Sequence, residues 1–169
     1  MRVLNDIEFN DYFILKQKAF IELDYTTIDS GMIPILKTLA KQSEIVPLFS
    51  CEGHLEDLSK DCLEDSYITF MCKDPTLVIN LFHELLLAYS DVEYQLRPTL
   101  DYSLLCIALA DDSWIQYPAY TFRVWLSTGE DKVRWLTNLN KLYLNIPSNG
   151  EGGSRKQNKR SFFNGTKCN

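Results

Sequence analysis

The sequence predicts an α+β fold: one domain with a mainly antiparallel mixed sheet of about five strands, packed with three helices. Three observations carry this prediction. Of the 169 residues, 46% are hydrophobic and 12% are aromatic, which is enough for one sizeable core. Segments rich in β-branched and aromatic residues interleave with segments whose apolar residues recur at helical spacing. Most of the strand-like segments also follow one another directly along the chain, which favours antiparallel pairing.

The first forty residues predict one clear helix after an ambiguous leading segment. Residues 6–23 mix apolar and charged positions and favour a short amphipathic helix, while the alternation over 18–25 favours a strand. The next helix is predicted over 30–42, where apolar residues recur at helical spacing. Asp29 is a good cap for it, and Pro34 falls in the first turn, where proline is tolerated.

The middle of the chain predicts two strands and a second helix. The apolar run 45–50 and the β-branched and aromatic run 66–72 are typical of buried strands. The acidic stretch 53–65 between them has no clear period, so we expect a loop or a short exposed helix there. Asp74 followed by Pro75 is an arrangement that opens a helix, with an acidic cap and proline in the first position.

The remaining part of the domain predicts three strands and a third helix. The strands are expected over 92–100, 103–110 and 120–127. The loop between the last two contains Trp114, which we expect to be exposed. Thr128 begins the final helix, because a threonine before an acidic turn and a periodic apolar face is typical of a helix start.

Charge divides the chain into an acidic body and a basic tail. The whole chain carries −6, and residues 150–169 hold five basic groups and one acid, so they carry +4 and leave −10 on residues 1–149. We therefore predict an α+β domain over 1–147 and a flexible basic tail over 148–169. An acidic body repels phosphate, so nucleic-acid binding is not expected of it, while the tail leaves contact with an anionic partner open.

Nothing in the sequence predicts export or membrane insertion. The N-terminal segment is acidic and lacks the apolar stretch of a signal peptide, and no apolar run approaches the roughly 18 residues of a spanning helix. The five cysteines are odd in number and irregularly spaced, which is typical of free thiols. The protein is therefore expected to work in a cytoplasm, a host's cytoplasm if it is viral.

The stretch richest in chemistry follows the strand predicted over 45–50. A strand end on a rigid scaffold is a common place for function, so this stretch is the candidate ligand pocket or structural hinge. Its five consecutive residues carry a hydroxyl, a thiol, a carboxylate, a glycine and an imidazole: Ser50, Cys51, Glu52, Gly53 and His54.

Several interpretations of this stretch stay open beside that of a purely structural turn. Cys51 and His54 have a spacing found in zinc sites, and Cys62 and Cys72 would complete a tetrahedral set. The same cysteine and histidine would suit a thiolate nucleophile, with Glu52 or Glu56 orienting the imidazole. Backbone N–H groups of the turn would also suit an anion-binding nest. The motifs of ordinary dinucleotide and nucleoside-triphosphate sites are absent from the sequence.

Protein binding is the interpretation that does not depend on this turn. Trp114 and Tyr117 offer aromatic anchors, and Glu56 and Asp57 belong to an acidic loop, so these four residues are the candidate partner surface. Since no full catalytic set is present in the sequence, a protein partner is the predicted ligand and an enzyme is not favoured.

The region 24–72 also resembles a known pattern. A helix leads to a strand ending in Ser-Cys-x-Gly-His and then to a second strand, which resembles small phage and mobile-element proteins of unassigned function. More distantly, it is similar to the tRNA wybutosine-synthesis methyltransferase family, whose strand ends in a Ser-Cys-Ser-Gly-Arg type motif. That family's later Gly-Gly-x-Trp stretch is absent from the sequence. The matching positions are Asp29, Ile33, Pro34, Leu36, Ser50, Cys51, Gly53 and, in place of the arginine, His54.

Three expectations about function follow, two of them from these resemblances. With the acidic body and basic tail, the first implies a phage-type cytoplasmic protein that engages a host or viral protein machine, in part through its acidic surface. The second implies the alternative of an S-adenosylmethionine- or nucleotide-using enzyme that acts on RNA, with the same turn lining its site. The cysteine and histidine spacing keeps a small zinc-binding protein as a further alternative.

Overall fold

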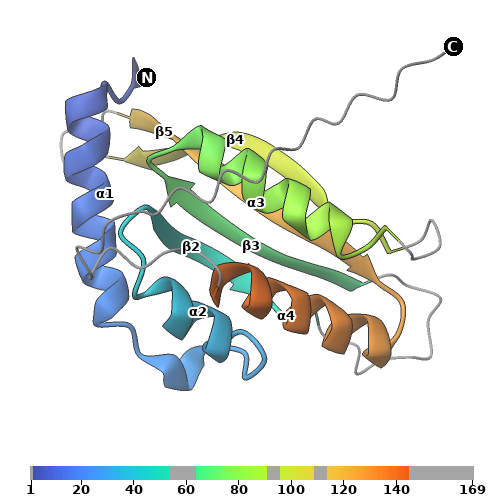
Figure 1. Ribbon diagram of the computed structural model, residues 1–169. Helices are drawn as coiled ribbons and strands as arrows, with labels where there is room; N and C mark the ends of the chain where they lie inside the picture. The colour runs from blue at the N-terminus through green and yellow to red at the C-terminus, as the bar shows by residue number, and fades with distance from the viewer. Residues whose placement is uncertain (1, 54–63, 91–95, 109–113, 145–169) are drawn as a thin grey trace, which may run out of the picture.

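A computed structural model describes residues 2–53, 64–90, 96–108 and 114–144 (Figure 1). A five-stranded mixed sheet lies at its centre, antiparallel except where the short first strand pairs with the last. The predicted α+β class is confirmed, with four helices rather than three. The strands are β1 (Arg2–Val3), β2 (Ile45–Cys51), β3 (Glu64–Cys72), β4 (Thr99–Ala108) and β5 (Trp114–Leu126). β4 pairs along one edge of β5, and β1 and β3 pair with different parts of its other edge. β2 pairs with the far edge of β3.

The helices lie on both faces of the sheet. They are α1 (Asp6–Ile21), α2 (Ile33–Leu39), α3 (Pro75–Leu87) and α4 (Gly129–Leu144), with a short 3₁₀ turn at Tyr25–Thr27. Helices α2, α3 and α4 share one face (Figure 1). Phe82 of α3 packs on Phe122 of β5, with ring centroids 5.7 Å apart, whereas Tyr12 of α1 packs on Tyr117 at 4.9 Å. Because these two β5 residues are five positions apart, α1 lies on the face opposite α3.

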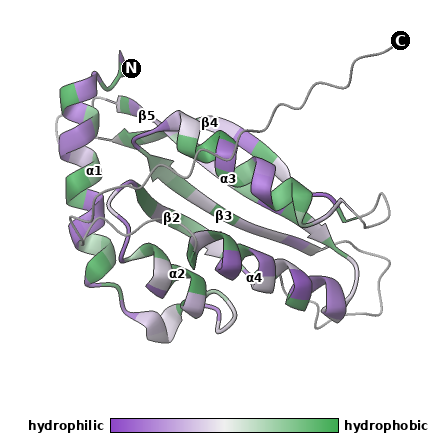
Figure 2. Ribbon diagram, in the orientation of Figure 1, coloured by the Kyte–Doolittle hydropathy of each residue, from purple (hydrophilic) through white to green (hydrophobic). Residues whose placement is uncertain are grey.

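The core includes buried side chains on both faces of the sheet, from the layer of α2, α3 and α4 and from α1, which buries Phe13 and Phe20. The burial of large side chains from sheet and helices alike explains why the layers hold together, since each buried aromatic removes up to about 150–250 Å² from water. Hydrophobic and hydrophilic segments alternate along α1 (Figure 2), and several of its apolar side chains, such as Ile7 and Leu15, are exposed. The largest fully buried side chains include Trp135, Tyr143, Phe13, Phe70, Phe122 and Met32.

The strand predicted over 18–25 is wrong, because α1 continues as one helix to Ile21. A capping box begins this helix: Asn5 Oδ1 accepts from the Glu8 N–H at 3.0 Å, and the Glu8 carboxylate accepts from the Asn5 N–H at 3.1 Å. Phe13 and Phe20 are both buried. They are two helical turns apart, so a single helix buries both on one side.

The predicted starts of α3 and α4 are confirmed. The Asp74 carboxylate accepts from the Thr76 N–H at 2.8 Å, with Pro75 in the first turn of α3. At α4, Thr128 Oγ1 accepts from the Asp131 N–H at 3.1 Å, and the Asp131 carboxylate accepts in return from the Thr128 N–H at 3.0 Å. Both helices therefore begin where side chains satisfy their first backbone N–H groups.

Asp131 holds its charge more strongly in the folded chain than in the unfolded one. Burial raises the pKa of its carboxyl, but hydrogen bonds from Ser127 and Thr128 outweigh that effect and leave the pKa below its usual range. The cap is therefore strongest when this carboxyl is ionised.

The last three predicted strands are two in the structure. β4 is one strand that pairs along its whole length with β5, from Thr99 opposite Arg123 to Ala108 opposite Trp114. The separate strand predicted over 92–100 is therefore wrong for its described part, because residues 96–98 are not in a strand and Thr99 and Leu100 begin β4. Residues 91–95 lie outside the described part of the chain. β5 itself begins at Trp114, inside the predicted loop, because the long pairing with β4 extends it.

The helix predicted over 30–42 is present but shorter. α2 spans Ile33–Leu39, and no side chain caps its start. The predicted tail over 148–169 lies outside the described residues. Within the described ranges, no helix is both long enough and apolar enough to cross a bilayer.

Candidate functional site

The turn after β2 is held in place by contacts of its own residues. Gly53 has a φ of +79°, and a Cβ there would meet Leu126 Cδ1 at 2.9 Å. A side chain at this position would be both strained and crowded, which explains the glycine. Ser66 Oγ donates to the Cys51 carbonyl at 3.0 Å and fixes the strand just before the turn.

Glu52 connects three parts of the fold. Its Oε2 accepts from the Gly31 N–H at 2.6 Å, and its Oε1 accepts from Lys132 Nζ of α4 at 2.7 Å. The Glu52 N–H donates to Asp29 Oδ2 at 3.1 Å. The side chains of the ion pair are only 15% and 23% exposed, so solvent screens it less than a surface pair. We call Asp29, Gly31, Glu52 and Lys132 the Glu52 brace.

Gly31 is close-packed inside this brace. A Cβ on Gly31 would lie 2.5 Å from Glu52 Oε2 and 2.6 Å from Leu136 Cδ1. Asp29, predicted to cap α2, instead accepts from the Glu52 backbone. The described part of the candidate stretch therefore joins the segment before α2, the end of β2 and α4, and its charged side chain has a structural role.

The predicted zinc set cannot form as a unit. Cys51 lies opposite Tyr67, and Cys72 lies opposite Ile45, so the two thiols are at opposite ends of the β2–β3 pair. Five strand residues separate these positions by roughly 17 Å, whereas ligands of one zinc ion each lie within about 2.3 Å of it. His54 and Cys62 lie outside the described residues. Within the described residues, no group of three metal-binding side chains comes together.

Cys72 is also a poor nucleophile or ligand in its present surroundings. Burial raises the pKa of this thiol to about 12, and its Sγ donates to the Asp74 carbonyl at 3.2 Å. Cys51 is half-buried, and with His54 outside the described residues the thiolate pair stays a prediction. For the nest, the Gly53 N–H already donates to Cys51 Sγ at 3.5 Å, which leaves it less available to an anion.

The predicted partner surface does not form from its two aromatic residues. Trp114 is 51% exposed, but Tyr117 is only 4% exposed and packs against α1. The two are three residues apart on β5, so they point to opposite faces of the sheet. The other two candidates, Glu56 and Asp57, lie outside the described residues.

Sequence reasoning missed a second surface, on the sheet face that carries α1. Beyond α1, no described helix covers this face. The Arg123 guanidinium lies 5.7 Å from the ring centroid of Tyr67 and 5.9 Å from that of Trp125. Phe49 of the neighbouring strand is 56% exposed and Trp125 is 42% exposed. We call Phe49, Tyr67, Arg123 and Trp125 the aromatic face. The alternation of the segment 120–127 was the signal that could have found Trp125.

Two acidic residues border Arg123 without fully satisfying it. Arg123 Nε lies 3.6 Å from Asp65 Oδ1 and 3.7 Å from Asp101 Oδ2, which is ion-pair range but too long for a hydrogen bond. Asp65 Oδ1 and Arg123 Nε are buried atoms with no hydrogen-bond partner among the described residues. Burial raises the pKa of Asp65, Arg123 lowers it and Asp101 raises it, with a net rise. These two buried atoms face each other as an ion pair, so Arg123 is held in place by charge as well as by the two rings.

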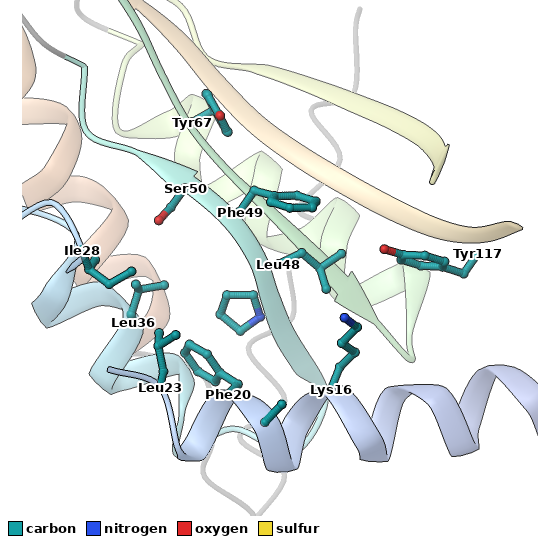
Figure 3. A pocket seen from close by; sticks show the side chains of 12 residues that line it. Lys16, Phe20, Leu23, Ile28, Leu36, Leu48, Phe49, Ser50, Tyr67 and Tyr117 are labelled. Carbon is teal, nitrogen blue, oxygen red and sulfur yellow. The ribbon is translucent and has the colours of Figure 1, made fainter. Parts of the chain in front are cut away.

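A hollow of about 490 Å³ opens beside the aromatic face, between α1 and β2 (Figure 3). Phe49 and Tyr67 contribute to its wall, so the hollow and the face are continuous. Lys16 and Tyr117 also line it, and their polar ends point toward the space beside Leu48 in this view.

Comparisons with models of known protein families, with curated proteins and with solved structures found no match. The resemblances to phage proteins and to the wybutosine-synthesis family therefore stay predictions, and function has to be argued from the geometry of this chain.

Proposed function

We propose that this chain is a binding protein that engages a protein partner through the aromatic face. The observation that carries the proposal is Arg123 held between Tyr67 and Trp125, next to the exposed ring of Phe49. Tryptophan, tyrosine and arginine dominate the binding energy of protein interfaces, and they do so when they cluster. Single exposed apolar residues are common on protein surfaces, but a patch of adjacent ones often marks an interaction site.

The face is also prepared for binding. Covering a large aromatic ring removes on the order of 100 Å² or more from water, which at about 25 cal/mol/Å² is worth several kcal/mol over three rings. Arg123 is already placed by two rings and two carboxylates, so ordering it costs little on association. The cost of ordering this side chain is thus already met in the free chain.

Charge indicates the kind of partner. The chain carries −6 overall, and Asp65 and Asp101 add acceptors at the edge of the aromatic face. A partner surface with basic groups around an apolar centre would be attracted to the aromatic face, and its basic groups would pair with the carboxylates at the edge. We further propose that this partner belongs to a host or viral protein machine, as the resemblance to phage proteins implies.

The proposal is tested by native mass spectrometry of the tagged chain isolated from its own cells. We expect the wild type to arrive with a stoichiometric protein partner. The double variant Phe49→Ser, Trp125→Ser should arrive alone. Ile7→Ser is the matched control, because Ile7 is a 76% exposed aliphatic residue of α1 that does not belong to the aromatic face. Cooperative melting curves are required of all three chains, so that a lost partner is not the result of unfolding. A double variant that keeps the partner would refute the proposal.

A further inference from the structure

An irregularity in β2 shapes the hollow beside the aromatic face. The pairing of β2 with β3 shifts register between Pro47 and Phe49, which leaves Leu48 as an extra residue. In a regular strand, consecutive side chains point to opposite faces. Here Pro47, Leu48, Phe49 and Ser50 all line the same hollow, and Figure 3 shows Leu48, Phe49 and Ser50 along one stretch of strand. β-Bulges often re-aim side chains next to functional sites, and this one builds a wall of four consecutive residues.

The remaining walls are mostly apolar and come from α1 and the segment that follows it. Phe20 of α1 and Leu36 of α2 are buried residues of the core, so the floor of the hollow is part of the rigid fold. Its volume of about 490 Å³ falls in the ordinary range of small-molecule pockets. An occupant would therefore meet a preformed apolar surface.

One positive charge stands at the edge of this apolar space. Lys16 is the only charged side chain among the described residues that line the hollow. Its ammonium lies 5.3 Å from the ring centroid of Tyr12, and it makes no ion pair with a described residue. Burial, together with Tyr12, raises the pKa of the neighbouring Tyr117 to about 12, and the Tyr117 hydroxyl is already hydrogen-bonded to that of Tyr12.

From this combination we infer that the hollow binds a small amphipathic carboxylate. The aliphatic or aromatic part of the ligand lies against Leu48 and Phe20, and its carboxylate meets the Lys16 ammonium. An unpaired ammonium beside an apolar wall selects an anion over a neutral or cationic ligand of the same length. The inference goes beyond the proposed function and stands without it, because it depends on Lys16 and the β2 bulge and not on Trp125.

Isothermal titration calorimetry of the full chain tests the ligand class with three probes of equal length. Octanoate should bind, 1-octanol should bind about tenfold more weakly or worse, and octylammonium should be the weakest, because only octanoate gains a charge-assisted hydrogen bond from the lysine. Equal binding of all three, or no octanoate binding at millimolar concentration, would overturn the inference.

Variants of α1 test the location. Lys16→Met should lower octanoate affinity about tenfold without changing 1-octanol affinity, and Lys16→Arg should largely restore it. Ala19→Trp places a large side chain in the hollow from an exposed position, so it should remove binding of both probes while leaving the melting temperature nearly unchanged. Lys18→Met is the matched control on the same helix and should bind octanoate like the wild type. Unchanged octanoate affinity in Ala19→Trp would place binding elsewhere and refute the site.

The two proposals fail independently. Trp125 does not line the hollow, so Trp125→Ser should lose the protein partner and keep octanoate. Ala19→Trp should lose octanoate and keep the partner. A Trp125→Ser chain that lost octanoate as well would contradict the separate site.

Discussion

Removing the Glu52 carboxylate should destabilise the protein far more than removing an ordinary surface charge. Glu52 accepts from the Gly31 N–H at 2.6 Å and from Lys132 Nζ at 2.7 Å, so Glu52→Ala disrupts two contacts that join separate parts of the fold. The Gly31 N–H is left in a partly buried place without its acceptor. Lys132 is left without its counter-charge.

The size of the effect follows from these two losses. A partly buried N–H that loses its acceptor costs about 1–3 kcal/mol. An ion pair with both partners mostly shielded contributes about 1 kcal/mol. Glu52→Ala should therefore lower the free energy of unfolding by about 2–4 kcal/mol, out of the roughly 5–15 kcal/mol that is typical of a domain. Lys132→Met removes only the ion pair and should cost about 1 kcal/mol.

Urea titration followed by circular dichroism measures the effect. With a denaturant slope of about 2 kcal/mol/M, the midpoint of Glu52→Ala should fall by about 1–2 M. Arg2→Gln is the control, because it removes an ion pair to Glu8 that is exposed on both sides, and its midpoint should not move measurably. A Glu52→Ala midpoint that stayed with this control would refute the structural role of Glu52.

Gly31→Ala gives a second test of the same brace. Its Cβ would meet Glu52 Oε2 at 2.5 Å, so the substitution should cost about 1–3 kcal/mol in the wild type. The same substitution should cost less in Glu52→Ala, where the carboxylate is gone and only the contact with Leu136 remains. Costs that add within about 0.5 kcal/mol would contradict the packing described here.

Three further predictions concern buried and titratable groups. Thr69 and Thr121 share a buried hydrogen bond of 2.8 Å. Changing either one to valine should lower the free energy of unfolding by about 1–3 kcal/mol, and changing both should cost clearly less than the sum of the two single changes. A double-mutant cycle by urea titration would show this. Iodoacetamide should modify the exposed Cys106 in the native protein and leave Cys72, with its pKa of about 12, unmodified until unfolding; early Cys72 labelling in peptide maps would contradict this. The pKa of Asp131 is lower in the folded chain, so its stabilisation is complete above the unfolded value of about 3.9 and is lost as the pH falls through the folded value. The melting temperatures of the wild type and Asp131→Asn should therefore converge as the pH falls through the folded pKa of Asp131. A difference in melting temperature that persisted at lower pH would contradict the role of the Asp131 carboxylate as a cap.

Local signals predicted local structure well. Asp74 before Pro75 and Thr128 before an acidic turn marked two helix starts, because capping depends only on residues within one turn. The strand predicted over 18–25 failed for a related reason. A short alternation of apolar and polar residues is also compatible with a helix. Phe20 belongs to the helical spacing that Phe13, two turns earlier, also follows, and both are buried.

The candidate site depended on contacts that sequence does not show. Glu52 and Lys132 are 80 positions apart, so no local pattern could assign the carboxylate to a brace instead of to catalysis. The alternation that exposes Trp125 was visible in the sequence, but which sheet face stays open depends on where α1 packs. Tyr117 was predicted to be exposed and is buried for the same reason.

The aromatic face is the proposed binding surface of this protein. The most direct measurement is the affinity of the purified partner for the wild type, Trp125→Ser and the control Ile7→Ser, by calorimetry at one salt concentration. If Trp125 is an interface anchor worth about 2 kcal/mol, Trp125→Ser should bind roughly 30-fold more weakly while Ile7→Ser binds like the wild type. Equal affinity of all three chains would contradict the claim and move the interface to another surface.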